Sequence, residues 1–85
     1  MGNNKLVQTV IDQGLSLMRT GNVSELQYHL WLEYSKSILA IASNNPAFSM
    51  NYNSVISVAL ANQSLKPFEK LSMCLRYLIG IQHII

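Results

Sequence analysis

Charged residues are scarce in this chain. Its 85 residues include six basic and four acidic ones, a charged share of 12%, whereas about 25% is usual in globular domains. Hydrophobic residues make up 49%. A short chain with so few charges leaves apolar side chains exposed, and exposed apolar patches usually mark interfaces. We therefore expect a protein that forms homo-oligomers or binds a protein partner.

The basic residues are too few and too dispersed to predict a nucleic-acid-binding surface. The formal net charge is +2, and the basic residues form no run. They are Lys5, Arg19, Lys36, Lys66, Lys70 and Arg76. Non-specific phosphate binding requires several such contacts on one surface. RNA is therefore expected as a partner only under the alternative function described below.

Cysteine, metal ligands and long apolar runs are also lacking. The single cysteine, Cys74, cannot form an intramolecular disulfide, and its apolar neighbours predict a buried thiol. With only His29 and His83 beside it, no metal site or cofactor is expected. No stretch reaches the roughly 18 apolar residues of a membrane span, and the N-terminus lacks the apolar core of a signal peptide. We expect a cytoplasmic protein with no membrane partner.

Apolar residues recur at spacings of three and four through most of the chain, which is the pattern of amphipathic helices. We predict one all-α domain over residues 1–85, either a compact four-helix bundle or an orthogonal helical array. Helices are expected at residues 4–20, 25–43, 47–61 and 67–84. The third segment is ambiguous, because "SVISVAL" could also be a strand. We favour a helix there, because the chain has no second strand candidate to pair with it.

Capping residues support these boundaries. Ser24 is followed three residues later by Gln27, and Asn22 is followed by Glu25; both spacings are typical of capping boxes. Pro67 suits the first position of the last helix.

The apolar stripes predict the core and the interface. The expected core residues are Trp31, Tyr34, Ile38, Phe68 and Leu71. The last helix stays apolar to its end, "RYLIGIQHII". That end either packs into the core, meets another chain or leads into a longer protein. The expected interface residues are Leu75, Leu78, Ile79, Ile81 and Ile85.

Two residues of the last helix have potential for chemistry. Glu69, Arg76 and His83 are seven residues apart, close to two helical turns, and therefore share one stripe. The Arg76–His83 spacing resembles the Arg-(four to six residues)-His signature of the HEPN nucleases, all-α proteins in which two protomers form a shared cleft. The resemblance implies metal-independent RNA cleavage, with His83 as general acid or base and Arg76 stabilising the phosphorane charge. The alternative is a solvated stripe in which Arg76 pairs with Glu69 or Ser72.

A longer part of the chain carries a second resemblance. "ELQYHLWLEYSKSILAIASNNPAF" and "LKPFEKLSMCLRYLIGI" are similar to small helical N-terminal domains of bacterial phage-defence and abortive-infection proteins. Leu26, Trp31, Ser35 and Leu39 hold comparable places, whereas Tyr28 stands one residue away from that family's aromatic step. The resemblance implies a bacterial or phage origin and an adaptor or oligomerising role.

These observations lead to two functional hypotheses. The first is a non-enzymatic helical module for protein–protein interaction or oligomerisation, such as a subunit or inhibitor in bacterial–phage conflict. The second is a dimeric HEPN-like ribonuclease that uses Arg76 and His83. The first hypothesis predicts that a charge at Leu78 or Ile81 breaks the assembly. The second predicts that alanine at Arg76 or His83 abolishes cleavage.

Overall fold

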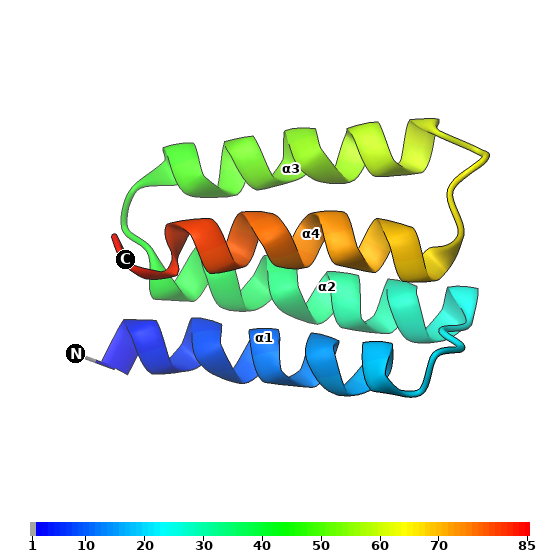
Figure 1. Cartoon of the computed structure of the whole chain (residues 1–85). Helices are drawn as coiled ribbons and strands as arrows, with labels where there is room; N and C mark the ends of the chain where they lie inside the picture. The colour runs from blue at the N-terminus through cyan, green and yellow to red at the C-terminus, as the bar shows by residue number, and fades with distance from the viewer. Residues whose placement is uncertain (1) are drawn as a thin grey trace.

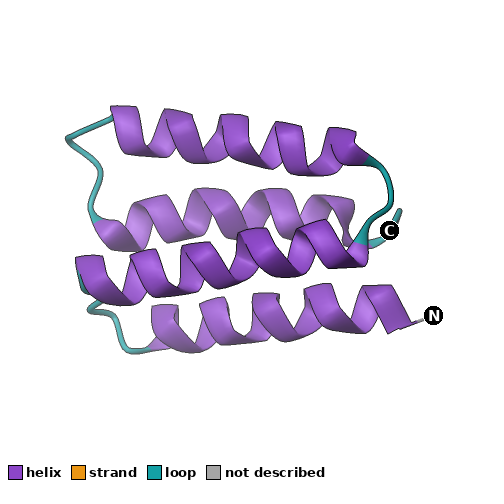
Figure 2. Ribbon diagram, turned by 180° about the vertical axis from the view of Figure 1, so that it is seen from behind, coloured by secondary structure: helices purple, strands orange, loops and turns teal. Residues whose placement is uncertain are grey.

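The protein consists of four α-helices, seen in a computed structural model that describes residues 2–85, with side chains from residue 4 onward (Figure 1). The helices are α1 (Gly2–Arg19), α2 (Glu25–Ala42), α3 (Pro46–Ala61) and α4 (Pro67–Gln82). No strand occurs in this part of the chain (Figure 2). The predicted all-α fold with four helices is confirmed. Met1, included in the predicted domain, lies outside the described residues.

The helices form an up-down bundle in which each runs antiparallel to the next (Figures 1 and 2). α1 and α3 lie on opposite sides, and α2 and α4 lie between them. α2 and α4 each pack against all three other helices, whereas α1 and α3 share no contact over residues 2–85. None of the four helices described is long and apolar enough to cross a membrane. Of the two predicted architectures, the structure adopts the bundle.

Local signals account for the helix starts. At α2, the Ser24 hydroxyl accepts the Gln27 backbone N–H at 3.1 Å, and the Gln27 side chain accepts the Ser24 N–H at 3.0 Å. This capping box forms at Ser24 rather than at Asn22. The ambiguous third segment is a helix. Asn45 caps it by accepting the Ala47 N–H at 3.0 Å, and a proline follows directly, where no amide hydrogen is needed.

The hydrophobic core lies where the apolar stripes of the four helices meet. Trp31 and Leu71, both predicted as core residues, are buried, and Ile38 packs against the core while partly exposed. The larger buried side chains are Val7, Val10, Ile11, Tyr28, Trp31, Leu32, Leu39, Tyr52, Ile56, Leu71, Leu75, Leu78 and Ile81.

Most of the residues predicted to form an interface on the last helix are buried within the single chain. Leu75, Leu78 and Ile81 are 2%, 1% and 8% exposed and belong to the core. The reason is the central place of α4, whose apolar stripe is covered by the three helices around it. Ile85 is partly buried and packs against the core as well. Ile79 remains at the surface.

Two aromatic residues predicted in the core lie at the surface instead. Tyr34 is 38% exposed and Phe68 is 37% exposed. Tyr34 directly precedes the buried Ser35, and one residue along a helix is a rotation of about 100°, which turns the ring away from the core. Phe68 lies in the first turn of α4, at the edge of the buried stripe.

Gly14 on α1 permits a close approach of helices. A Cβ atom placed there would lie 2.7 Å from Leu75 Cδ2 and 3.1 Å from two carbons of the Trp31 ring. Trp31 cannot easily move, because its indole N–H donates to the Val10 carbonyl at 3.0 Å. We expect Gly14→Ala to lower the free energy of unfolding by about 1–2 kcal/mol, since overpacking outweighs the better helix propensity of alanine. Urea unfolding measures this change.

Gly80 on α4 provides the matched control. It is also inside a helix, but a Cβ atom there would have no neighbour within 4 Å. Gly80→Ala should therefore raise the free energy of unfolding by about 0.5–1 kcal/mol. Equal effects of the two alanines would contradict the close packing at Gly14.

Candidate functional site

Arg76 and His83 lie on the outward side of α4. Both side chains are exposed. Arg76 borders a hollow of about 280 Å³ together with Phe68, Glu69 and Ser72. His83 follows the last residue of α4, and seven helical residues span about 10 Å along the axis. Within one chain, the Arg76 and His83 side chains therefore lie on the solvent-exposed side of α4.

The ion pair predicted for Arg76 is not formed. The Glu69 carboxylate accepts the backbone N–H of Lys66 at 3.1 Å and so caps the start of α4. Among the side chains from residue 4 onward, neither Arg76 nor His83 takes part in a salt bridge. Both groups are therefore available to an external ligand.

Three close contacts pair other acidic and basic side chains, and Lys70 in one of them is buried. Glu25 lies 3.5 Å from His29 and 3.8 Å from Lys70, and Lys36 lies 3.7 Å from Glu33. No three His, Cys, Asp or Glu side chains gather in a possible metal site anywhere in the described part of the chain.

Four polar side chains meet inside the core. The Ser35 hydroxyl donates to the Leu32 carbonyl at 2.7 Å, so the Tyr52 hydroxyl, 2.6 Å away, donates to Ser35. The Tyr28 hydroxyl is buried and has no hydrogen-bond partner among the described residues. The Cys74 thiol is close enough to both phenols to affect their ionisation.

Burial lowers the reactivity of the thiol and phenol groups in this cluster. Desolvation raises the pKa of Tyr28, Tyr52 and Cys74, because each anion would lose its hydration inside the protein. A thiol with a raised pKa stays protonated at neutral pH and is a poor nucleophile. We assign the cluster a structural role.

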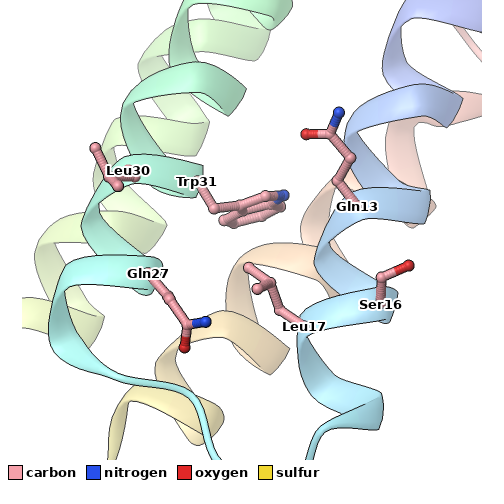
Figure 3. A pocket seen from close by; sticks show the side chains of 6 residues that line it. All are labelled: Gln13, Ser16, Leu17, Gln27, Leu30 and Trp31. Carbon is pink, nitrogen blue, oxygen red and sulfur yellow. The ribbon is translucent and has the colours of Figure 1, made fainter.

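The largest hollow described lies between α1 and α2 (Figure 3). We call it the α1–α2 groove. It measures about 450 Å³ and is lined by Gln13, Ser16, Leu17, Gln27, Leu30 and Trp31. Trp31 extends from α2 toward α1, and Leu17 extends from α1 beside it (Figure 3). The floor is apolar and the edges carry amide and hydroxyl groups, with no charged residue in the lining. Such a surface suits an apolar side chain or a polypeptide.

A row of exposed apolar side chains runs along α2 beside this groove. We call it the outer stripe, and it consists of Leu26, Leu30, Tyr34 and Ile41. Leu26, Leu30 and Ile41 are 67%, 64% and 67% exposed. Spacings of four, four and seven place the four residues on one side of the helix. Scattered exposed leucines are ordinary on a protein surface, but an aligned row marks an interaction surface.

The sequence interpretation missed the outer stripe because α2 is apolar on two sides. The side facing the core includes Tyr28, Trp31 and Leu32, and the outer stripe lies on the other side. The spacing of Leu26, Leu30 and Tyr34 was visible in the sequence. However, periodicity alone does not say which of two apolar sides faces the core.

The α1–α2 groove and the outer stripe together form the candidate site, which is identified from geometry alone. No protein-family model, curated protein or solved structure matches this chain.

Proposed function

We propose that the protein is a non-enzymatic interaction module that binds a protein through the outer stripe and the α1–α2 groove. The observation that carries this proposal is the alignment of Leu26, Leu30 and Tyr34 beside a groove without charged lining residues. Burial of a leucine side chain contributes about 1.5–3 kcal/mol when it is complete. Leu26 and Leu30 are about two-thirds exposed, so much of that free energy is gained only when a partner covers them.

A surface of this kind agrees with how interfaces are built. Interface centres are poor in charged residues and rich in aromatic and large apolar ones. Here Trp31 forms the groove wall and Tyr34 stands on the stripe, while the Gln13 and Gln27 amides can bond a partner's polar groups. The resemblance of residues 25–48 and 65–81 to phage-defence domains suggests a partner in bacterial–phage conflict.

Site-specific photo-crosslinking tests this function. A photoreactive residue at Leu30 should yield a discrete protein adduct in cells, because this position would lie inside the contact. The same residue at Ser54 serves as control, since Ser54 is exposed on α3, the helix that has no contact with α1. Adducts at both positions, or at neither, would contradict the proposal.

The HEPN-like ribonuclease remains the second candidate. Arg76 and His83 are exposed, and neither side chain takes part in a salt bridge among the described residues. Both are therefore available to bind RNA, which favours this candidate. The test is RNA cleavage by the wild-type protein and by His83→Ala prepared identically. Cleavage lost only in the variant would support the ribonuclease. Equal cleavage, or none, would support the interaction module.

A further inference from the structure

We infer that α3 is a lid that opens as a unit, while α1, α2 and α4 stay packed together and the buried Cys74 thiol becomes accessible. This inference goes beyond the proposed function and does not depend on it, because the outer stripe and the α1–α2 groove involve no residue of α3. It is carried by the small buried surface of α3, by the position of its hydrogen bonds and by the packing of the other three helices.

The buried surface of α3 is small. The helix lies at one side of the bundle (Figure 1), and only Tyr52, Ile56 and Ala59 of its 16 residues are buried. The two central helices, α2 and α4, each bury six residues. Because burial of apolar surface is the main favourable contribution to packing, separating α3 from the bundle costs less than separating either central helix.

The composition of α3 adds little stability of its own. Its sequence, "PAFSMNYNSVISVALA", contains no charged residue, so the helix forms no ion pair. Asparagine, serine, valine and tyrosine are poor helix formers, and they make up half of its 16 residues. A short helix of this composition depends on its neighbours to stay folded.

Two tyrosines attach α3 to both of its neighbours. Tyr52 on α3 donates to the Ser35 hydroxyl of α2 at 2.6 Å. Tyr77 on α4 donates to the Phe48 carbonyl of α3 at 2.9 Å. The Tyr52 and Tyr77 rings are stacked, with their centroids 5.5 Å apart. Both hydrogen bonds lie in the first half of α3, so breaking them at one place loosens the helix from α2 and α4 together.

The other three helices share a core that does not need α3. α1, α2 and α4 each pack against the other two, and α1 has no contact with α3 over residues 2–85. The Trp31 indole of α2 donates to the Val10 carbonyl of α1. Gly14 of α1 leaves room for the side chains of Trp31 and Leu75. These contacts persist when α3 opens, as is typical of proteins that unfold one element at a time.

α3 covers the Cys74 thiol. Cys74 lies on α4 and is 0% exposed, and the Tyr52 side chain of α3 is one of its polar neighbours. Residues 43–45 and 62–66, which flank α3, are mostly exposed and provide the hinges. Movement of α3 about these hinges takes Tyr52 away from the thiol. Cys74 is the single cysteine of the chain, so its alkylation reports this opening.

Alkylation of the folded protein by dilute iodoacetamide tests the inference. The opening equilibrium calculated from the Cys74 alkylation rate should exceed the global unfolding equilibrium from urea experiments on the order of 100-fold or more. Its dependence on urea should be less than about half of the global one, because opening of one helix exposes less surface. Equal equilibria with equal urea dependence would overturn the lid.

Two matched isoleucine variants identify the helix that moves. Ile56 on α3 is 5% exposed and Ile11 on α1 is 2% exposed. Ile56→Val should speed Cys74 alkylation by roughly 2-fold to 10-fold, because it weakens the closed state only. Ile11→Val should lower global stability by a similar amount, yet leave alkylation within about twofold of the wild type. Equal acceleration in both variants, or none in either, would overturn the inference.

Hydrogen exchange provides a measurement without any substitution. The backbone amides of α3 should exchange through the same opening equilibrium as Cys74 alkylation. The central amides of α1, α2 and α4 should exchange only through global unfolding. Protection of α3 equal to that of the other helices would overturn the lid, even if Cys74 reacts quickly.

Discussion

A glutamate at position 78 should unfold the protein. Leu78 is 1% exposed and belongs to the core, on the helix that packs against the other three. Leu78→Glu removes a buried leucine side chain and forces either a charge or an unpaired carboxyl group into the core. The first change costs about 2–5 kcal/mol and the second adds several more. A domain of this size has about 4–13 kcal/mol of stability in total. Far-ultraviolet circular dichroism should show loss of helix at neutral pH.

The neighbouring residue provides the control for this prediction. Ile79 is 42% exposed, so Ile79→Glu should keep the fold and change the free energy of unfolding by less than about 1 kcal/mol. The pair also decides between two accounts of α4. If Leu78→Glu stays folded and only loses partners, the apolar face of α4 is an interface, as the sequence alone suggested.

The sequence was sufficient to predict the four helices because their signals are local. The Ser24–Gln27 capping box determines the start of α2, and Pro67 determines the start of α4. Each signal involves only residues that are close together in the sequence. The spacing of three and four on α4 was likewise enough to identify Leu71, Leu75 and Leu78 as one face. These patterns depend on the backbone of one helix and need no knowledge of its neighbours.

Whether an apolar helix face points into the core or toward solvent depends on the neighbouring helices, and the sequence did not reveal this direction. The α4 face became core because α4 occupies a central place in the bundle. The stripe with Leu30 became surface because α2 has two apolar sides and the three other helices cover only one of them. The Ser35–Tyr52 hydrogen bond joins residues of different helices and has no local signal. The candidate site was therefore recognised from how the helices pack, whereas Arg76 and His83 were recognised from their spacing in the sequence.

The structure separates the two functional hypotheses in space. Arg76 and His83 stand on α4, while the outer stripe lies on α2. The interaction hypothesis places the contact with a partner on α2. A shared catalytic cleft of the HEPN kind would require the α4 helices of two chains to meet instead. The position of a measured contact therefore bears on both hypotheses.

Stability should fall steeply above about pH 10. Burial raises the pKa of Tyr28, Tyr52 and Cys74 above their ordinary values of 10.0, 10.0 and 9.0. In the unfolded chain these groups ionise near the ordinary values, while in the folded protein they keep their protons. The unfolded state then binds fewer protons, so the free energy of unfolding decreases as pH rises. At neutral pH both states are protonated, and the full stability is present.

The expected slope follows from the number of groups. Each contributes about 1.4 kcal/mol per pH unit in the range where only the unfolded state is ionised. Tyr28 and Tyr52 together give about 3 kcal/mol per pH unit above pH 10, which removes a stability of about 4–13 kcal/mol within roughly one to five units. Cys74 adds to the slope between its ordinary and its raised pKa. Urea unfolding at a series of pH values from neutral to alkaline measures this slope.

Two phenylalanine variants assign the slope to the buried cluster. Tyr28→Phe removes one ionising group and should reduce the slope by about 1.4 kcal/mol per pH unit. At neutral pH it should be as stable as the wild type or more so, because the Tyr28 hydroxyl has no partner among the described residues. Tyr52→Phe should reduce the slope equally but lose about 1 kcal/mol at neutral pH, since it breaks the bond to Ser35. An unchanged slope in both variants would mean that these hydroxyls ionise as easily in the folded protein as in water, and would contradict the buried cluster as the cause of the slope.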